Sequence, residues 1–270
     1  MMNNILARLL LVFYLLSVHV ALAQSNDVID MAVGWHKPPY VMAESNSGFE
    51  LELVRTVFQS MGYSTSAIFV PYGRSHSMLK SGLVDIVLTV NRSVGIAPTH
   101  LSEVYVTYQN VALSLKKSQL DIYHIEDLAK YSIVSFQNAT MILGQDYANA
   151  IAQSPLYIEL PEQRRQVELL LLGNTQAVVM DINIFSSLSK ELTGKNTLDQ
   201  VHVHDLFAPN PYRIGFKDQA LKRKFNQALG AYLGSENHLE LLQKYDFYLS
   251  HKLPFPTTDA LVKNSSNKKG

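Results

Sequence analysis

The sequence contains no cysteine. This absence excludes a disulfide scaffold, thiolate metal ligands, a cysteine nucleophile and a lipid-modified cysteine behind a leader peptide. An excess of either charge is also missing, since 23 lysine and arginine residues balance 23 aspartate and glutamate residues. Without a net charge, no long-range field favours nucleic acid or an anionic membrane surface, so we expect no nucleic-acid partner. A chain of 270 residues is long enough to be stabilised by a buried apolar core instead.

The N-terminal residues have the pattern of a leader for export. Arg8 supplies a positive charge, residues 9–22 are largely apolar, and Ala21 and Ala23 form the small-x-small pattern that a signal peptidase cleaves. This apolar stretch of about fourteen residues is shorter than the roughly twenty of a membrane-spanning helix. We therefore expect residues 1–23 to be a signal peptide cleaved after Ala23, and the mature protein to reside in the periplasm.

Short apolar runs alternate with amphipathic stretches along the rest of the chain, which is the pattern of an α/β protein. Apolar residues at three- and four-residue steps indicate the helices, and a glycine such as Gly62 ends them. The expected strands are residues 28–33, 67–70, 84–90, 105–115, 132–136, 176–180, 201–206 and 212–216. The expected helices are residues 49–61, 75–80, 139–152, 164–172, 183–192, 220–233 and 238–245, with a further helix starting at 125.

Nine segments resemble, in their order and spacing, the extracellular solute-binding proteins, family 3, of polar amino acid transporters. The segments are residues 34–40, 47–53, 71–74, 78–85, 125–128, 134–140, 177–181, 225–229 and 241–245. The resemblance implies an α/β fold of the periplasmic binding protein-like type II, in which two α/β lobes are joined by a two-strand hinge. Lobe 1 would comprise residues 24–110 and 207–250, lobe 2 residues 111–206, and residues 251–270 a C-terminal tail. Hinge strands at 111–115 and 201–206 would let the lobes close on a ligand.

A cleft that holds a zwitterion needs a cation for the carboxylate, and two arginines are candidates. A guanidinium binds a carboxylate through two parallel hydrogen bonds. Arg74 follows the end of an expected strand, and Arg92, with its neighbour Asn91, follows the end of another, where α/β proteins bind ligands. Alignment on the later family segment places Gly95 or Ile96 at the family's arginine. The carboxylate clamp is therefore Arg92, Arg74 or neither.

Three further positions are candidates for polar contacts in the second lobe. The resemblance implies that Asp181 receives a ligand ammonium, but Asp181 also stands where an aspartate caps the helix expected from residue 183. Asn138 and Thr140 open a helix whose backbone N–H groups could bind an anion, or Asn138 could simply cap that helix. Ala139 replaces the glycine that the family has at this turn.

Aromatic residues near the strand ends could form the walls of the cleft. We expect Trp35, Tyr40 and Tyr72 to stack on the ligand, because Trp35 lies in a proline-rich loop rather than on a helix face. His202 and His204 lie on one face of an expected strand, but no third ligand accompanies them at a supporting spacing. We therefore expect neither a metal nor a cofactor.

The predicted function is capture of a small polar solute, an amino acid or a related carboxylate, by lobe closure. The resemblance implies a monomeric receptor that delivers its ligand to an ABC permease and is not an enzyme. Two alternatives remain open. One is a periplasmic receptor that reports its ligand to a membrane signalling protein. The other is a dehydratase on the same fold, with Glu103 or Asp181 as its general acid.

Overall fold

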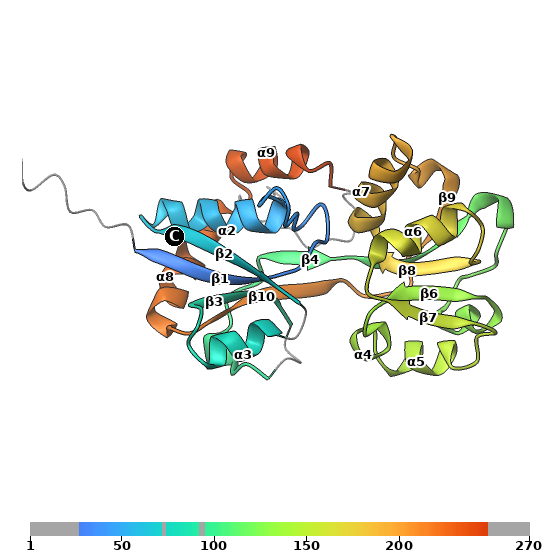
Figure 1. The fold of residues 1–270 in the computed structure, drawn as a ribbon, viewed down its shortest axis with the longest axis horizontal. Coiled ribbons are helices and arrows are strands. Elements are labelled where there is room, and N and C mark those ends of the chain that lie inside the picture. The colour runs from blue at the N-terminus through green and yellow to red at the C-terminus, as the bar shows by residue number, and fades with distance from the viewer. Residues whose placement is uncertain (1–26, 72–73, 92–94, 248–270) are drawn as a thin grey trace, which may run out of the picture.

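The computed structural model describes residues 27–71, 74–91 and 95–247. The expected signal peptide, Tyr72, Arg92 and the expected C-terminal tail lie outside these residues. The described chain forms two five-stranded sheets, each covered by helices on both faces (Figure 1). The two sheets lie side by side and form two α/β lobes, as predicted.

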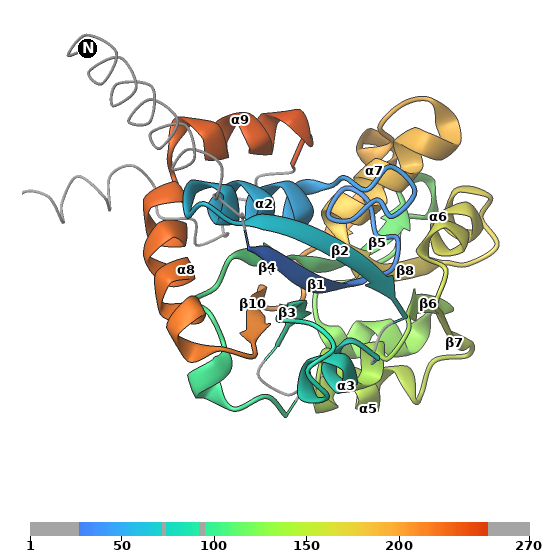
Figure 2. The same cartoon turned by 60° about the vertical axis from the view of Figure 1, so that its left-hand side comes forward.

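The first lobe contains the sheet with strand order β2-β1-β3-β10-β4. Its strands are β1 (Val28–Gly34), β2 (Ser64–Val70), β3 (Ile86–Val90), β4 (Val106–Tyr108) and β10 (Asn210–Phe216). β1 pairs in parallel with β2 and β3, while β10 is antiparallel to β3 and β4. One face is covered by α2 (Phe49–Ser60), α8 (Gln219–Tyr232) and α9 (Glu236–Lys244), and the other by α3 (Arg74–Lys80) (Figures 1 and 2).

The second lobe contains the sheet with strand order β7-β6-β8-β5-β9. Its strands are β5 (Asn110–Leu115), β6 (Ile133–Phe136), β7 (Tyr157–Leu160), β8 (Ala177–Asp181) and β9 (Val201–His204). Its helices are α4 (Ala139–Ile142), α5 (Gln145–Ile151), α6 (Gln163–Leu171) and α7 (Ile182–Thr193). Short 3₁₀ turns lie at Pro98–His100, Lys116–Ser118, Ile125–Lys130 and Leu198–Gln200.

The sequence-based elements differ from the structure at three places. The single helix expected over 139–152 is two helices, because Gly144 has a φ of 92°, which interrupts the helical backbone. The extended run expected over 105–115 is two strands, β4 and β5, which belong to different sheets. Strand β7 was not predicted. It has four residues between Pro155 and Pro161, which is too few to show the alternation of apolar and polar residues that indicates a strand.

Gln109 lies between β4 and β5, where the chain first passes from one sheet to the other. Its side chain connects this crossing to the return crossing between β9 and β10. The buried Gln109 side-chain Nε2 donates to Oδ1 of Asp205 at 3.2 Å and to the carbonyl of Phe207 at 2.9 Å. Its backbone N–H donates to Oδ2 of Asp181 at 2.8 Å. The two crossings therefore lie side by side and are joined at the base of the space between the lobes.

Candidate ligand-binding cleft

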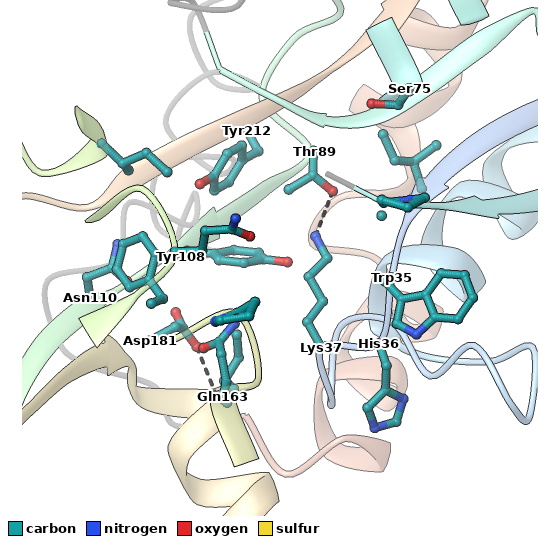
Figure 3. A pocket seen from close by; sticks show the side chains of 18 of the residues that line it. Trp35, His36, Lys37, Ser75, Thr89, Tyr108, Asn110, Gln163, Asp181 and Tyr212 are labelled. Carbon is teal, nitrogen blue, oxygen red and sulfur yellow. Dashed lines mark hydrogen bonds between the residues drawn. The ribbon is translucent and has the colours of Figure 1, made fainter. Parts of the chain in front are cut away.

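A cavity of about 380 Å³ lies between the two lobes and is lined by side chains of both. This volume is within the range of small-molecule sites, which are clefts of roughly 300–1,000 Å³. The first lobe contributes the loop after β1, the start of α3 and the ends of β3, β4 and β10; the second contributes the ends of β5, β6 and β8 and the starts of α6 and α7. Figure 3 labels ten of the lining residues: Trp35, His36, Lys37, Ser75, Thr89, Tyr108, Asn110, Gln163, Asp181 and Tyr212.

The loop after β1 is held against the first turn of α2. The N–H groups of Phe49 and Glu50 donate to the carbonyls of Pro39 and Tyr40 at 2.9 and 3.0 Å, so the loop backbone takes the place of a side-chain cap. Gly48 makes this contact possible, since its φ is 124° and a Cβ there would lie 2.4 Å from the Tyr40 carbonyl oxygen. The loop and the start of the helix thus form one unit beside the cleft.

Glu50 lies fully buried beneath the cavity, where protein donors surround its carboxylate. Oε1 accepts from Lys37 Nζ at 3.2 Å and from the Tyr108 hydroxyl. Oε2 accepts from Thr89 Oγ1 at 2.7 Å and from the Tyr105 hydroxyl. Burial raises the pKa of Glu50, but the Lys37 ammonium and the hydroxyl donors outweigh it and bring the pKa below its ordinary value. Glu50 is therefore a buried, ionised counterion for Lys37.

Lys37 carries a positive charge to the floor of the cavity. Its ammonium donates to Thr89 Oγ1 at 2.8 Å and to Glu50, and it lies 5.1 Å from the centre of the Tyr108 ring (Figure 3). Burial lowers the pKa of Lys37, and the attraction of Glu50 opposes that change. An ammonium has three N–H donors, and these two acceptors leave one for another partner.

Thr89 supports this arrangement with an unusual backbone. Its φ is 59°, a conformation that is costly for a β-branched residue. The Thr89 N–H donates to the Tyr105 hydroxyl at 3.0 Å, and its own hydroxyl lies between Lys37 and Glu50. The strained residue therefore links the end of β3 to the buried ion pair.

Asp181 lines the cavity from the second lobe but is only 2% exposed. Oδ1 caps α7, accepting from the N–H groups of Asn183 at 2.9 Å and Ile184 at 3.0 Å. Oδ2 accepts from the Gln109 N–H at 2.8 Å and from the Tyr40 hydroxyl at 3.2 Å. Burial raises the pKa of Asp181 to about 7, although these donors oppose the shift. The capping role considered from the sequence is thus present.

Tyr40 lies behind the cavity rather than in its wall. The side chain is fully buried, and its ring stacks on Tyr108 with the two centres 3.8 Å apart. Its hydroxyl accepts from Asn183 Nδ2 at 3.0 Å while donating to Asp181. Tyr40 therefore connects the loop after β1 in the first lobe to the start of α7 in the second.

The N–H groups at the start of α4 already have an anionic partner, Glu159 of β7. The Glu159 carboxylate accepts from the Asn138 N–H at 2.7 Å, and from the Thr140 N–H and hydroxyl, both at 3.1 Å. The Tyr157 hydroxyl is a fourth donor at 2.8 Å. Burial raises the pKa of Glu159, but these donors outweigh it and hold the pKa below its ordinary value. The protein's own carboxylate thus occupies the position considered for a ligand anion.

The other predicted site residues fall into three groups. Trp35 lines the cavity and is 60% exposed, so it stands at the mouth. Arg74 is an exposed residue at the start of α3, and Asn91 follows β3; neither is among the described residues that line the cavity. Tyr72 and Arg92 lie outside the described residues. The ligand-binding roles of all nine residues stay predictions.

Sequence reasoning missed the charged pair that the structure places at the cleft. Lys37 and Glu50 both lie inside segments that carried the family resemblance, but neither was singled out. Tyr105 and Tyr108, whose hydroxyls both reach Glu50, are three residues apart in a run read as one strand. The signal available in the sequence is the position of Lys37 in the loop that follows the first expected strand.

Neither a metal site nor a membrane span is found among residues 27–71, 74–91 and 95–247. No three or more histidine, aspartate or glutamate side chains of that part are grouped to hold a metal ion. Both ring nitrogens of His204 have protein partners, Ser114 Oγ at 2.8 Å and the carbonyl of Ile122 at 2.9 Å. None of the helices in that part combines the length and the apolar character needed to cross a membrane.

Two mixed α/β lobes with a cleft between them define the periplasmic binding protein-like fold of type II, and solved structures confirm this class. A Streptococcus pneumoniae substrate-binding protein of an ABC uptake transporter, solved with bound histidine, is similar with a TM-score of 0.63 and 18% identity, over 82% of this chain and 93% of that one. An ancestral amino acid-binding protein described as a precursor of cyclohexadienyl dehydratase has a TM-score of 0.64 and 18% identity, over 81% of this chain and 95% of that one.

A histidine kinase sensor domain with similarity to periplasmic binding proteins also has this fold, with a TM-score of 0.65 and 17% identity, over 81% of this chain and 95% of that one. No family model and no curated protein sequence matches the chain. At this level of identity the likeness shows the shared fold.

Proposed function

We propose that this protein captures a small polar solute, an amino acid or a related carboxylate, by closing its two lobes on it. The observation that carries the proposal is the cavity of about 380 Å³ that both lobes line, with the Lys37 ammonium at its floor. A ligand held there contacts both lobes at once, so binding favours the closed arrangement.

The crossings between the lobes supply the hinge in this proposal. We propose that residues 111–115 and 201–206 absorb the change in backbone angles, with residues 24–110 and 207–250 moving as one lobe and 111–206 as the other. The hydrogen bonds of Gln109 to Asp205 and Phe207 support this arrangement, because they hold the two crossings together at one place. Closure about such a pair of segments is a common hinge motion.

The geometry favours binding over catalysis. Glu103, one candidate for a general acid, has a side chain that is 73% exposed and pairs with Arg213 at 3.4 Å, and it is not among the described residues of the cavity. The other candidate, Asp181, caps α7 and accepts four hydrogen bonds from the protein. We therefore propose a receptor without enzymatic activity.

We propose that the partner is an ABC permease in the inner membrane, to which the receptor delivers its ligand as a periplasmic monomer. The similar fold of the S. pneumoniae transporter protein supports this choice. A second candidate, supported by the fold of the histidine kinase sensor domain, is a receptor whose liganded form docks on a membrane signalling protein. A neighbouring gene for a permease and ATPase would favour transport, and one for a kinase or cyclase would favour signalling.

The test is a ligand screen with two readouts on the mature protein. Amino acids, polyamines, opines and small carboxylates are added singly, and melting temperature and tryptophan fluorescence are recorded. Trp35 is the one tryptophan of the sequence and lies at the mouth of the cavity, so its emission reports on the cleft. A ligand at 100 times its Kd stabilises the native state by about 2.7 kcal/mol. The proposal is wrong if no compound at millimolar concentration changes either readout.

A further inference from the structure

We propose that the cleft binds a small organic acid that carries no ammonium group, held through its carboxylate by Lys37. This inference rests on the proposed function and narrows its ligand from amino acids and carboxylates to carboxylates alone. The inference is based on the hydrogen bonds of Asp181, the described carboxylate that lines the cavity. Protein donors occupy both of its oxygens, which a ligand ammonium would need as acceptors.

Asp181 is the described carboxylate in the cavity wall. An ionised carboxylate offers about four lone-pair sites, and each Asp181 oxygen accepts two hydrogen bonds from the protein. Three of the four donors are backbone N–H groups, from Gln109, Asn183 and Ile184, which the fold holds in place. An ammonium could bind Asp181 only by displacing the α7 cap, the Gln109 N–H at the lobe crossing or the Tyr40 hydroxyl that joins the two lobes.

Two other carboxylates near the cleft, Glu50 and Glu159, also accept hydrogen bonds from the protein, and neither is among the described residues that line the cavity. Glu50 accepts from one ammonium and three hydroxyls beneath the cavity and is fully buried. Glu159 accepts from two backbone N–H groups and two hydroxyls at the start of α4. An ammonium in the cleft would lack an ionised partner among the described lining residues, and a buried charge without such a partner is costly. The described cleft therefore selects against a zwitterion.

The donors that remain suit a carboxylate. Of the described lining residues, Lys37 is the one lysine or arginine, and one N–H of its ammonium is left after Glu50 and Thr89. The side-chain amides of Gln137 and Gln163 line the same cavity from the second lobe. Figure 3 shows the Lys37 side chain pointing toward Thr89, to which it donates a hydrogen bond. One ammonium and neutral amides can hold the two oxygens of a single carboxylate.

The walls of the cavity suit an apolar or aromatic body. Trp35 and Tyr212 contribute aromatic surface from the first lobe, and Phe136, Ile142 and Ile184 contribute apolar surface from the second. A flat hydrocarbon group between such walls is stabilised by burial and by ring stacking. The ligand class is therefore a monocarboxylate with a compact apolar or aromatic body.

Titration of the mature protein with matched pairs of compounds tests this inference. Each pair is an amino acid and the same acid without its amino group: phenylalanine and 3-phenylpropanoate, leucine and 4-methylpentanoate, tryptophan and indole-3-propanoate. The corresponding amines, which keep the side chain and the amino group but lack the carboxylate, complete the set; phenethylamine is one. Calorimetry gives the affinities, and we expect at least one deaminated acid to bind at least ten times more tightly than its amino acid, with no binding of the amines.

Lys37 variants locate the carboxylate contact. Lys37→Gln keeps a donor for Glu50 but removes the charge, and we expect it to weaken binding of the acid at least tenfold. Lys80→Gln, at an exposed lysine that ends α3, is the matched control and should bind as wild type. Circular dichroism establishes whether each variant is folded. If Lys37→Gln does not fold, titration of the wild-type protein with the matched pairs of compounds still tests the inference.

Two results overturn the inference in distinguishable ways. If amino acids bind and their deaminated partners do not, the ammonium is required, and the inference fails while the proposed function stands. If neither member of any pair nor any compound of the wider screen binds, the proposed function fails as well. If the Lys37→Gln protein is folded and binds the acids as tightly as wild type does, Lys37 does not hold the ligand carboxylate.

Discussion

The hydroxyl of Tyr40, in the first lobe, lies 3.2 Å from Oδ2 of Asp181, in the second, and donates a hydrogen bond to it. The same hydroxyl accepts from Asn183 Nδ2 at the start of α7. Since Tyr40 also stacks on Tyr108, which reaches Glu50, an unbroken polar and aromatic path runs from the buried ion pair to the second lobe. Movement between the lobes therefore changes the surroundings of Asp181, whereas the donors to Glu50 all belong to the first lobe.

Tyr40→Phe tests this connection between the lobes. The variant keeps the stacked ring but loses the hydroxyl, so we expect the free energy of unfolding to fall by about 1 kcal/mol. The pKa of Asp181 should rise further, because the hydroxyl stabilises its ionised form. Urea titration measures the first effect. Tyr123→Phe, at a tyrosine that is 74% exposed, is the control and should leave stability within about 0.5 kcal/mol of wild type.

Glu50→Gln should destabilise the protein strongly. It leaves Lys37 without its counterion in a buried site, and breaking a buried ion pair costs about 3–5 kcal/mol. Glu52→Gln is a close control, since Glu52 lies in the same turn of α2 and pairs with Lys244 at the surface. An exposed pair is worth roughly 0–1 kcal/mol. If urea unfolding shows equal losses of unfolding free energy for the two variants, burial of the Lys37–Glu50 pair does not determine how much that pair stabilises the protein.

A double variant separates the ion pair from the general packing of this region. Glu50→Gln combined with Lys37→Met removes both charges, so we expect it to lose less stability than the sum of the two single variants. The same unfolding experiment measures the difference. Strict additivity would mean that Lys37 and Glu50 do not depend on each other energetically.

The sequence predicted the two-lobed α/β fold because that fold depends on local patterns repeated along the chain. Alternating apolar runs and helical spacing are local, and nine short segments agreed on one order. The predicted position of Trp35, in a loop after a strand, also agrees with its place at the mouth of the cavity. Errors in the elements arose where one residue decides the backbone, as at Gly144.

The details of the cleft could not be predicted because they depend on contacts between distant residues. Tyr40 and Asp181 are 141 positions apart, and their bond exists only after both lobes have formed. Glu159 reaches Asn138 through β7, a strand too short to be recognised. Lys37 pairs with Glu50 because Gly48 lets the loop pack closely on α2, which no pattern of charges reveals.

Asp181 should make the stability of the protein fall as pH rises toward neutrality. Burial raises its folded pKa from 3.8 to about 7, so the folded state binds the proton more tightly than the unfolded state. This contribution is complete below the unfolded pKa and is lost as pH rises through the folded pKa, a window from about 4 to about 7. A shift of this size corresponds to about 4 kcal/mol over the whole window.

Asp181→Asn isolates this effect from other titrating groups. Asparagine also caps helices, and its side chain does not titrate. Tyr40 and Lys37 face Asp181, and both remain in the variant, so the difference between the two proteins reports on Asp181 itself. We expect urea unfolding between pH 4 and 8 to show the loss for wild type and a flatter profile for the variant. Parallel profiles would contradict a buried, proton-binding Asp181.

Gly48→Ala should damage both stability and ligand binding, and Gly62→Ala provides the comparison. Both glycines have a positive φ, 124° and 84°, so alanine at either site costs backbone strain of about 1–2 kcal/mol. At Gly62 an added Cβ meets no atom within 4 Å, whereas at Gly48 it lies 2.4 Å from the Tyr40 carbonyl oxygen. Relieving that overlap requires the loop to move off α2, at a further cost of about 1–3 kcal/mol.

Because Lys37 lies in this same loop, Gly48→Ala should also weaken ligand binding, while Gly62→Ala should not. Gly62 follows α2 at its far end, away from the described lining of the cavity. Urea unfolding and calorimetric titration of both variants measure the two effects. If Gly48→Ala loses stability but binds the ligand as tightly as Gly62→Ala does, the position of the loop does not control the cleft, and Lys37 is not held in place by the contact with α2.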